Sequence, residues 1–405
     1  MAGLPRPLRT LLKFVQHTAE RILDYPLLSD PSDWKIAVRP YDTYGTPERL
    51  WFLGRVLRDH GLAEPTVHDS PWKNLVRTFH ALESDEAPGA AVEITTRGHR
   101  RVTRADDEGF VDCYLDNDDS PRQPGWHAIR VKHLGPDAEK LFRQNLSPAQ
   151  GKPAAAATRD RQSGHCLIPD PASQFAIISD IDDTVLQSAV TRPIQMLKLL
   201  CFGNAHTRAA IEGTPGLYQA LVRGGAEHQA IDGPENPVFY VSSSPWSLQP
   251  MLSKFMEVVG LPRGPMMLRD MGIGRDGDAA IGHGHKEIKI AHILETYPEM
   301  KAVLLGDAGQ EDAAIYGRLC ERFPDQIIVA YIRHVDAMPS DRVVRAVAAA
   351  HDRGAEVLLL PSTEAITADA ERRGLLTTEA GPQVENTSAT TTHPRPARPH
   401  LSVAS

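Results

Sequence analysis

The chain has 405 residues, of which 41% are hydrophobic and 24% charged, and its formal net charge is −8. This length suffices for two domains of ordinary size, each with its own core. The acidic surplus argues against a nucleic-acid partner, because phosphate backbones are held mainly by surplus Lys and Arg. The four cysteines form no Cys-x-x-Cys pair, which argues against a zinc knuckle or a disulfide scaffold.

Residues 1–30 are predicted to contain an amphipathic helix, because apolar residues within 8–24 recur at helical spacing and Pro26 follows them. Two interpretations remain open. The helix docks on the body of the protein, or it lies on an anionic membrane surface. Lys13, Gln16 and His17 interrupt the apolar pattern too early for a signal peptide. No stretch of the sequence approaches the roughly 18 uninterrupted apolar residues that are needed to cross a bilayer. We therefore expect a cytoplasmic protein, with peripheral membrane attachment as the alternative.

Residues 35–168 contain short apolar segments separated by turn signals, a pattern typical of an antiparallel β-sandwich-like domain. Asp106-Asp107-Glu108-Gly109 is predicted to be a turn of solvated acids between two strands. Residues 148–163, rich in Ala, Pro and Gln, are predicted to be a linker. The expected strands are 35–40, 50–57, 90–96, 109–115, 125–133 and 166–168.

Beyond residue 174 strand-like segments alternate with helical ones, which predicts an α/β domain with a mostly parallel sheet over 174–362. In such sheets the active site lies beyond the carboxyl ends of the strands. The tail 365–405 lacks the apolar periodicity of a core and is predicted to be disordered. The expected strands are 174–180, 238–242, 266–269, 302–306, 327–333 and 356–360.

Three carboxylates follow the first of these strands in the run Asp180-Ile-Asp182-Asp183-Thr184. Like charges this close to a core need an offsetting cation or proton. A carboxylate can attack phosphorus to give an aspartyl-phosphate, and a second acid can protonate the leaving group and then activate water. We assign these roles to Asp180 and Asp182. Taken alone, an Asp-x-Asp-x-Thr run can also be a turn of solvated acids.

Polar residues from later segments fall at the same predicted edge of the sheet. Ser242 follows the second strand and can hydrogen-bond a phosphoryl oxygen, while Lys286 precedes the fourth and can neutralise developing charge. Thr184 and Ser243 are further candidate phosphate ligands. Ser244 is expected to be a helix N-cap, because a proline follows it. Each residue alone has a structural interpretation, as a core hydroxyl or a solvated lysine, and their shared placement is what favours catalysis.

The acidic residues of the predicted site also form a candidate Mg²⁺ site, since this cation prefers oxygen ligands and bridges carboxylates to phosphate. We expect the side chains of Asp180 and Asp307 and the backbone carbonyl of Asp182 as ligands. Asp312 is expected to bind the metal directly or to orient one of its water ligands. Gly306-Asp307 alone could equally be a turn that ends a strand.

The motifs of the second domain occur together in one order along the chain. They are Ser179-Asp-Ile-Asp-Asp-Thr-Val185, Tyr240-Val-Ser-Ser-Ser-Pro-Trp246, Leu261-Pro-Arg-Gly-Pro265 with Leu268-Arg-Asp270, His285-Lys286, Gly306-Asp307 with Gln310 and Asp312, and Tyr331-Ile-Arg333. From about 174 to 335 this set resembles the catalytic domain of actin-patch type phosphatidate phosphatases, a family of the haloacid dehalogenase superfamily. The N-terminal part is more weakly similar to bacterial members.

This resemblance implies a Rossmann-like haloacid dehalogenase domain with a parallel sheet and a small cap. It also implies Mg²⁺-dependent hydrolysis of phosphatidate to diacylglycerol and phosphate through an aspartyl-phosphate. The segment between the first two motifs, 187–236, is short, and a small cap would leave the site open to a membrane-embedded phosphoester. The alternatives are a phosphatase of a soluble phosphomonoester with the same mechanism and a non-catalytic lipid-binding scaffold.

Overall fold

The computed structural model of the protein is described here for ten ranges of the chain. The predicted N-terminal helix and most of the predicted linker lie outside these ranges. The described ranges are 35–59, 86–97, 99–116, 121–135, 162–181, 213–231, 233–269, 284–308, 311–334 and 339–377.

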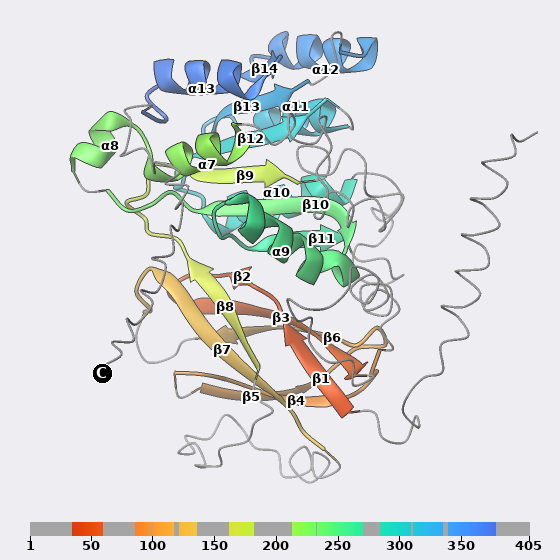
Figure 1. Ribbon diagram of the computed structural model, residues 1–405. Coiled ribbons are helices and arrows are strands. Elements are labelled where there is room, and N and C mark those ends of the chain that lie inside the picture. The colour runs from red at the N-terminus through yellow and green to blue at the C-terminus, as the bar shows by residue number, and fades with distance from the viewer. Residues whose placement is uncertain are drawn as a thin grey trace, which may run out of the picture.

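Two sheets packed face to face form the N-terminal β-domain, which we define as residues 35–168 (Figure 1). Their facing sides bury a shared cluster that includes Leu50 and Phe52 from one sheet and Ile94 and Ile129 from the other. This arrangement is the sandwich that the turn spacing predicts. The first sheet contains β1 (Lys35–Pro40), β3 (Arg49–Asp59) and β6 (Phe110–Asp116), and the second contains β2 (Thr43–Tyr44), β8 (Gln162–Ile168), β7 (Gly125–His133), β4 (Ala91–Thr96) and β5 (His99–Arg104).

The structure corrects two details of the β-domain. Strand β5 was not predicted, because its sequence is almost entirely polar and it lies at the edge of its sheet, where none of its residues is buried. Strand β8 starts at Gln162, so the predicted linker extends two residues too far. The predicted acidic turn is present. The Asp106 carboxylate accepts hydrogen bonds from the backbone N–H groups of Glu108 (3.0 Å) and Phe110 (2.8 Å), and Gly109 has a positive φ of 75°.

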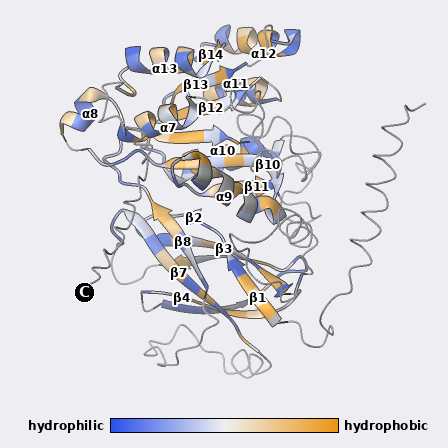
Figure 2. Ribbon diagram, viewed as in Figure 1, coloured by the Kyte–Doolittle hydropathy of each residue, from blue (hydrophilic) through white to orange (hydrophobic). Residues whose placement is uncertain are grey.

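A six-stranded sheet, parallel throughout, forms the second region, which we call the α/β domain. Every residue of the central strand β9 is buried, so both of its faces are covered, as in a sheet with helices on both sides. Figure 2 shows the hydropathy of each residue along the ribbon of this sheet. The strand order is β11 (Met266–Arg269), β10 (Val238–Pro245), β9 (Ala176–Asp180), β12 (Ala302–Asp307), β13 (Ile327–Arg333) and β14 (Val357–Leu360).

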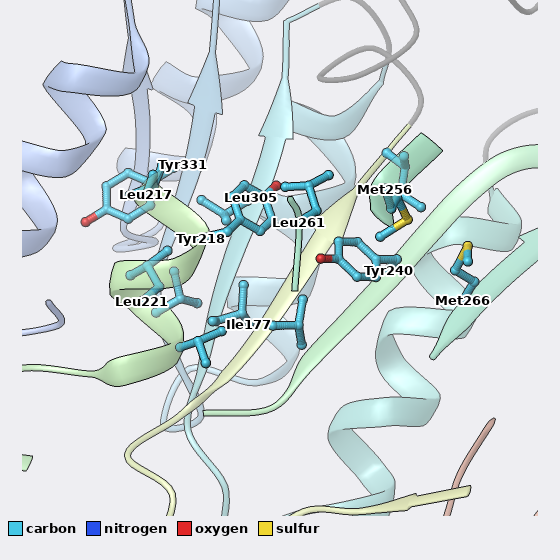
Figure 3. Packing of buried hydrophobic residues seen from close by; sticks show 14 of the residues in the cluster. Ile177, Leu217, Tyr218, Leu221, Tyr240, Met256, Leu261, Met266, Leu305 and Tyr331 are labelled. Atoms are coloured by element: carbon cyan, nitrogen blue, oxygen red, sulfur yellow. The ribbon is translucent and has the colours of Figure 1, made fainter. Parts of the chain in front are cut away.

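Helices cover both faces of this sheet. Figure 3 shows Leu217 and Leu221 of α7 packed near Ile177 of β9 on one face. Burial of each such side chain contributes roughly 1.5–3 kcal/mol. The first face carries α7 (Thr214–Arg223), α9 (Gln249–Val259) and α13 (Thr363–Arg372), and the second carries α10 (Gly284–Thr296), α11 (Asp312–Arg322) and α12 (Asp341–His351). The short α8 (Ala226–Ala230) follows α7.

Two predicted boundaries of the α/β domain are wrong. The domain does not end at 362, because α13 follows and buries Ile366 in the core cluster, together with Leu375 and Leu376. Residues 365–377 therefore belong to the fold rather than to a disordered tail. The segment 187–236 is not all cap, because α7 packs directly on the sheet. Residues 187–212 lie outside the described residues.

The segment that joins β1 to β3 connects the two domains. The Tyr41 ring stacks on Trp246 of the α/β domain with centroids 4.5 Å apart. Tyr44 packs edge-on against Phe239 of β10 at 5.5 Å, and its hydroxyl lies 2.5 Å from Nδ1 of His292. Tyr41 belongs to the core cluster on one face of the parallel sheet and Tyr44 to that on the other. The β-domain therefore contacts both faces of the sheet.

A cavity of about 310 Å³ lies between the β-domain and α9, lined by Tyr41, Trp246, Met256 and Met266 among others. At its edge the Arg263 guanidinium donates to the Asp42 carboxylate at 2.9 Å, which adds an ion pair to the contact between the domains. None of the helices in the described part of the chain combines the length and apolar character needed to cross a bilayer.

Candidate active site

The candidate nucleophile Asp180 is the last residue of the central strand β9 and is 2% exposed. On one side Asp180 is in register with Val241 of β10, so Ser242 follows directly beside it. On the other side Ser179 is in register with Leu305 of β12, two residues before Asp307. The parallel sheet therefore brings Asp180, Ser242 and Asp307 to one edge, as the sequence predicts.

Lys286 joins this edge from the first turn of α10. Its Nζ donates to Oδ2 of Asp180 at 2.7 Å and to Oδ1 of Asp312 at 3.2 Å. All three side chains are at most 2% exposed. Ion pairs enclosed to this degree are little screened by water, so the ammonium group interacts strongly with both carboxylates. The structure thus brings together a predicted nucleophile, the predicted lysine and a predicted metal-site acid.

Asp312 holds the start of α11 against the end of β12. Its Oδ2 accepts from the backbone N–H of Asp307 at 3.4 Å, while its Oδ1 accepts from Lys286. Gly306 lies between these groups. A Cβ at Gly306 would meet Asp312 Oδ2 at 2.8 Å and the Tyr316 ring at 2.9 Å. The glycine therefore allows the close approach that places the two acids side by side.

The described part of the site carries more negative than positive charge. Asp180, Asp307 and Asp312 are three buried carboxylates, and the Lys286 ammonium group donates to two of them, Asp180 and Asp312. If all four groups are ionised, three negative charges face one positive charge among them, and such an excess is costly in a buried site. A divalent cation would supply the difference, and a donor set of oxygens suits Mg²⁺.

Among the described residues no three His, Cys, Asp or Glu side chains gather as a ready-made metal-binding group. This does not conflict with the predicted Mg²⁺ site, because Mg²⁺ keeps several waters and is usually held by one or two carboxylates. Asp182, whose backbone carbonyl is a predicted ligand, lies outside the described residues, as does the predicted phosphate ligand Thr184.

The three serines after β10 have different surroundings. Oγ of Ser242 accepts from the backbone N–H of Ser244 at 2.9 Å, so this fully buried hydroxyl shapes the end of the strand. Ser243 is half-buried. The expected N-cap role of Ser244 is wrong, because the short 3₁₀ helix η2 begins at Trp246 with Pro245 before it and no side-chain cap. The strand extends through Pro245 instead and keeps Ser244 buried.

Two residues near the candidate nucleophile Asp180 were not predicted to contact it or each other. The Ser179 hydroxyl donates to the backbone carbonyl of Asp180 at 3.0 Å and lies 2.5 Å from the Tyr218 hydroxyl. Burial raises the pKa of Tyr218 to about 12, so this phenol stays neutral at physiological pH and can donate to Ser179. The sequence contains only a weak indication of this contact between Ser179 and Tyr218. Ser179 immediately precedes the acidic run, but nothing in the local sequence of α7 indicates that Tyr218 would reach it.

Arg333 is the last residue of β13 and is buried at the same edge of the sheet. Its Nη1 donates to the hydroxyls of Thr214 (3.2 Å) and Thr363 (3.1 Å). The arginine thus links the starts of α7 and α13 at the same edge of the sheet. The motif Tyr331-Ile-Arg333 indicated that this position matters, but its partners come from helices that the sequence pattern did not define.

The parallel sheet with helices on both faces defines an α/β protein. Buried carboxylates and a lysine gather at the carboxyl ends of its central strands, and such a cluster is typical of an enzyme active site. Residues 175–334 match the family model described as phosphatidate phosphatase APP1, catalytic domain. The resemblance drawn from the sequence motifs is confirmed for this part of the chain.

Two yeast proteins are similar over this region. Phosphatidate phosphatase APP1 of Saccharomyces cerevisiae is 30% identical over 168 residues, which are 41% of this chain and 27% of that protein. An uncharacterized protein of Schizosaccharomyces pombe is 30% identical over 165 residues, which are 40% of this chain and 25% of that protein. This chain therefore spans about a quarter of the length of the curated relatives it matches.

Among solved structures, a carbohydrate acetylesterase from Xanthomonas citri aligns with 84% of this chain and 74% of its own. The sequence identity is 10% and the TM-score 0.30. A likeness at this level carries no argument about fold or function.

Proposed function

We propose that this protein is a Mg²⁺-dependent phosphatidate phosphatase with a haloacid dehalogenase-type domain, which hydrolyses phosphatidate to diacylglycerol and phosphate. The observation that carries the proposal is the enclosed contact of Lys286 with Asp180 and Asp312. This contact lies within the segment that matches the catalytic-domain family model. A scaffold without catalytic activity would have no need to bury these charges together.

In the proposed reaction an Oδ atom of Asp180 attacks the phosphorus, and the bond from phosphorus to the glycerol oxygen breaks. Asp182 gives its proton to the departing alkoxide, which leaves as diacylglycerol. Asp182 then takes a proton from a water molecule, whose oxygen attacks the phosphorus of the aspartyl-phosphate. Inorganic phosphate forms and the Asp180 carboxylate is restored. Lys286 offsets the charge on the phosphoryl oxygens in both steps.

The remaining predicted residues bind rather than react. Ser242, Ser243 and Thr184 are proposed to donate hydrogen bonds to phosphoryl oxygens. Bound Mg²⁺ would supply further charge neutralisation, held by Asp180, Asp307 and the backbone carbonyl of Asp182. Asp312 keeps Lys286 and Asp307 in place by accepting hydrogen bonds from both, and we propose that it also orients a water ligand of the metal.

The substrate and the location of the protein are part of the proposal. We propose phosphatidate because the matched family carries that activity in its name. A cytoplasmic protein that meets its substrate at the membrane surface agrees with the amphipathic pattern of residues 8–24.

A substrate panel tests this function. The full chain is assayed for phosphate release from phosphatidate in mixed micelles, with Mg²⁺ or with EDTA, beside a sugar phosphate and a nucleotide monophosphate. We expect Mg²⁺-dependent turnover that favours phosphatidate. Asp180→Asn should abolish it, while the control Asp325→Asn, at an exposed position after α11, should leave it unchanged.

Other outcomes of the panel select other functions. Preference for the sugar or nucleotide phosphate would assign a soluble phosphomonoester as substrate with the same mechanism. No turnover of any substrate, together with flotation of the chain on phosphatidate vesicles, would assign a lipid-binding scaffold. Turnover that survives Asp180→Asn would refute the nucleophile.

A further inference from the structure

The cavity between the β-domain and α9, which we call the interdomain cavity, contains none of the residues assigned to phosphate hydrolysis. Its volume is about 310 Å³, and residues of both domains line it. Sites for small molecules span roughly 300–1,000 Å³ and occur preferentially at domain interfaces. A volume at the low end of this range suits one hydrocarbon chain rather than a whole lipid with two chains.

Apolar side chains form most of the wall of the interdomain cavity. Figure 3 shows Met256 of α9 and Met266 of β11 on the same side of Tyr240, and all three belong to one core cluster. Methionine side chains are flexible and polarizable, so they adapt to the shape of an apolar ligand. The apolar residues of the wall are Tyr41, Trp246, Met256, Leu261, Pro262 and Met266.

The polar side chains of the wall are paired with one another or face solvent. The Arg263 guanidinium donates to the Asp42 carboxylate at 2.9 Å. On α9 the Gln249 amide donates to the Ser253 hydroxyl at 2.8 Å. Glu257, the third charged residue of the wall, is exposed. A polar ligand would have to disrupt these pairs to bind, whereas an apolar ligand leaves them in place. The wall therefore favours an apolar ligand.

The interdomain cavity lies close to the candidate active site. Met266 is in register with Tyr240, which is in register with Ser179, the residue before the candidate nucleophile. Neighbouring strands lie about 4.8 Å apart, so the Cα atoms of Met266 and Ser179 are about 10 Å apart. Trp246 comes four residues after Ser242, so their Cα atoms are at most about 14 Å apart. One acyl chain spans about 15 Å, half of a bilayer core. A chain on a headgroup in the site is therefore long enough to enter the cavity.

We propose that the interdomain cavity binds one acyl chain of the phospholipid whose phosphate group is hydrolysed at the candidate active site. This inference rests on the proposed function, because the headgroup in the active site holds the chain near the cavity. Each methylene that moves from water into the cavity favours binding by about fourfold. The cavity thus selects a substrate with a hydrocarbon chain over a soluble phosphomonoester.

Kinetics with substrates of increasing chain length test the cavity in the full chain. Phosphatidates with short acyl chains are presented at concentrations where they stay monomeric in water, so that no membrane contributes to the rate. We expect KM to fall by up to about fourfold for each methylene added to a chain, until the cavity is filled. We expect kcat to stay the same, because the chain is bound equally well in the ground state and in the transition state.

Filling the cavity should remove most of this dependence of KM on chain length. Ser253→Phe adds a ring to the wall from α9. Ser253→Leu adds a smaller side chain and decides the test if the phenylalanine variant does not fold. Ala368→Phe is the matched control, because it adds the same ring at an exposed position of α13, and it should keep the full dependence. A dependence on chain length that survives in both Ser253 variants would overturn the proposal.

Fluorescence quenching measures binding of the chain without turnover. The Asp180→Asn protein is titrated with an alkyl phosphate that carries bromine at the end of its chain, because bromine quenches an indole ring that it contacts. We expect saturable quenching that Trp246→Phe greatly weakens, since Trp246 lines the cavity. Ser253→Phe should weaken it as well. Trp51→Phe is the control, because Trp51 of β3 packs against Tyr44 instead, and it should leave the quenching by Trp246 in place.

The two measurements separate this inference from the proposed function. Quenching that depends on Trp246, in a protein that does not hydrolyse phosphatidate, would support the chain-binding cavity and refute the proposed function. Hydrolysis of phosphatidate with a KM independent of chain length, together with quenching that Trp246→Phe does not change, would overturn the cavity and leave the proposed function intact.

Discussion

At the scale of single residues, Lys286 shows how a buried charge is held in place. Its ammonium group lies between two carboxylates from β9 and α11, and the side chain is 1% exposed. Removing one member of such a group leaves the others buried without compensation, which costs more than the pair itself contributes. The same residue is proposed to neutralise phosphoryl charge, so stability and activity should both depend on it.

Lys286→Met should therefore lose about a hundred- to a thousandfold in kcat and be destabilised by about 3–5 kcal/mol in buffer without metal. Phosphate release and urea denaturation measure the two effects. Lys301→Met, which removes a lysine from an exposed position before β12, is the control and should change neither. A Lys286→Met protein with normal kcat would contradict the assigned role.

Asp369 is a buried charge with a structural role, because it fixes α13 to the sheet. Tyr331 donates to its Oδ2 at 2.8 Å, and Arg373 donates to the same oxygen at 2.7 Å. Burial alone would raise the pKa of Asp369, but these two partners lower it below its usual 3.8. A carboxyl group with a lowered pKa stabilises the folded state above its unfolded pKa, and this stability is lost as pH falls through the folded value.

Asp369→Asn should therefore cost about 2 kcal/mol of unfolding free energy at pH 7, and the difference from the parent should shrink below about pH 4. Urea denaturation between pH 7 and pH 3 measures this difference. A difference that stays constant across that range would show that the charge of Asp369 does not contribute.

At the scale of elements, the connection from β12 to α11 depends on a strand residue without a side chain. Gly306 leaves room for the Asp312 carboxylate and the Tyr316 ring. The Tyr316 hydroxyl in turn donates to the carbonyl of Leu305 at 2.9 Å. Several contacts close to the candidate metal ligand Asp307 therefore position helix α11.

Gly306→Ala should disturb this connection, because its Cβ would lie 2.8 Å from a carboxylate oxygen. We expect a loss of about 1–3 kcal/mol in stability together with reduced turnover. Gly216→Ala is the matched control, since a Cβ there meets nothing within 4 Å and alanine favours the helix α7. The control should be as stable as the parent or more so. Equal behaviour of the two variants would contradict the argument from close approach.

At the scale of the whole molecule, the β-domain is joined to the strand that leads into the candidate site. Tyr41 stacks on Trp246, four residues after Ser242 in the chain. Tyr44, from the same short segment, packs against the opposite face of the parallel sheet. We therefore expect the β-domain to stabilise the α/β domain and the geometry after β10.

Tyr41→Ala should lower the unfolding free energy by about 3–5 kcal/mol, because it removes a buried aromatic ring, and it should reduce phosphate release. Tyr41→Phe keeps the stack and should retain most of both properties. Tyr114→Ala, which removes a tyrosine that is 40% exposed on β6, is the control in the same domain. Thermal unfolding and the phosphatase assay measure the two effects. If Tyr41→Ala behaved like this control in both, the two domains would be independent of each other.

The sequence by itself determined the alternation of strands and helices and the placement of Asp180, Ser242, Lys286 and Asp307 at one edge. These features follow from local patterns: continuous apolar runs mark buried parallel strands, and the chain order places their carboxyl ends together. Where the pattern was weak, prediction failed. The polar edge strand β5 carries no apolar alternation, and the apolar stripe of α13 is short and follows the last strand.

Only the tertiary structure decided which charged groups touch. Lys286 and Asp180 are separated by 106 positions in the chain, and no local period indicates that their side chains meet. Hydrophobic periodicity specifies which face of an element is buried, whereas the pairing of charges depends on how the faces of several elements pack together.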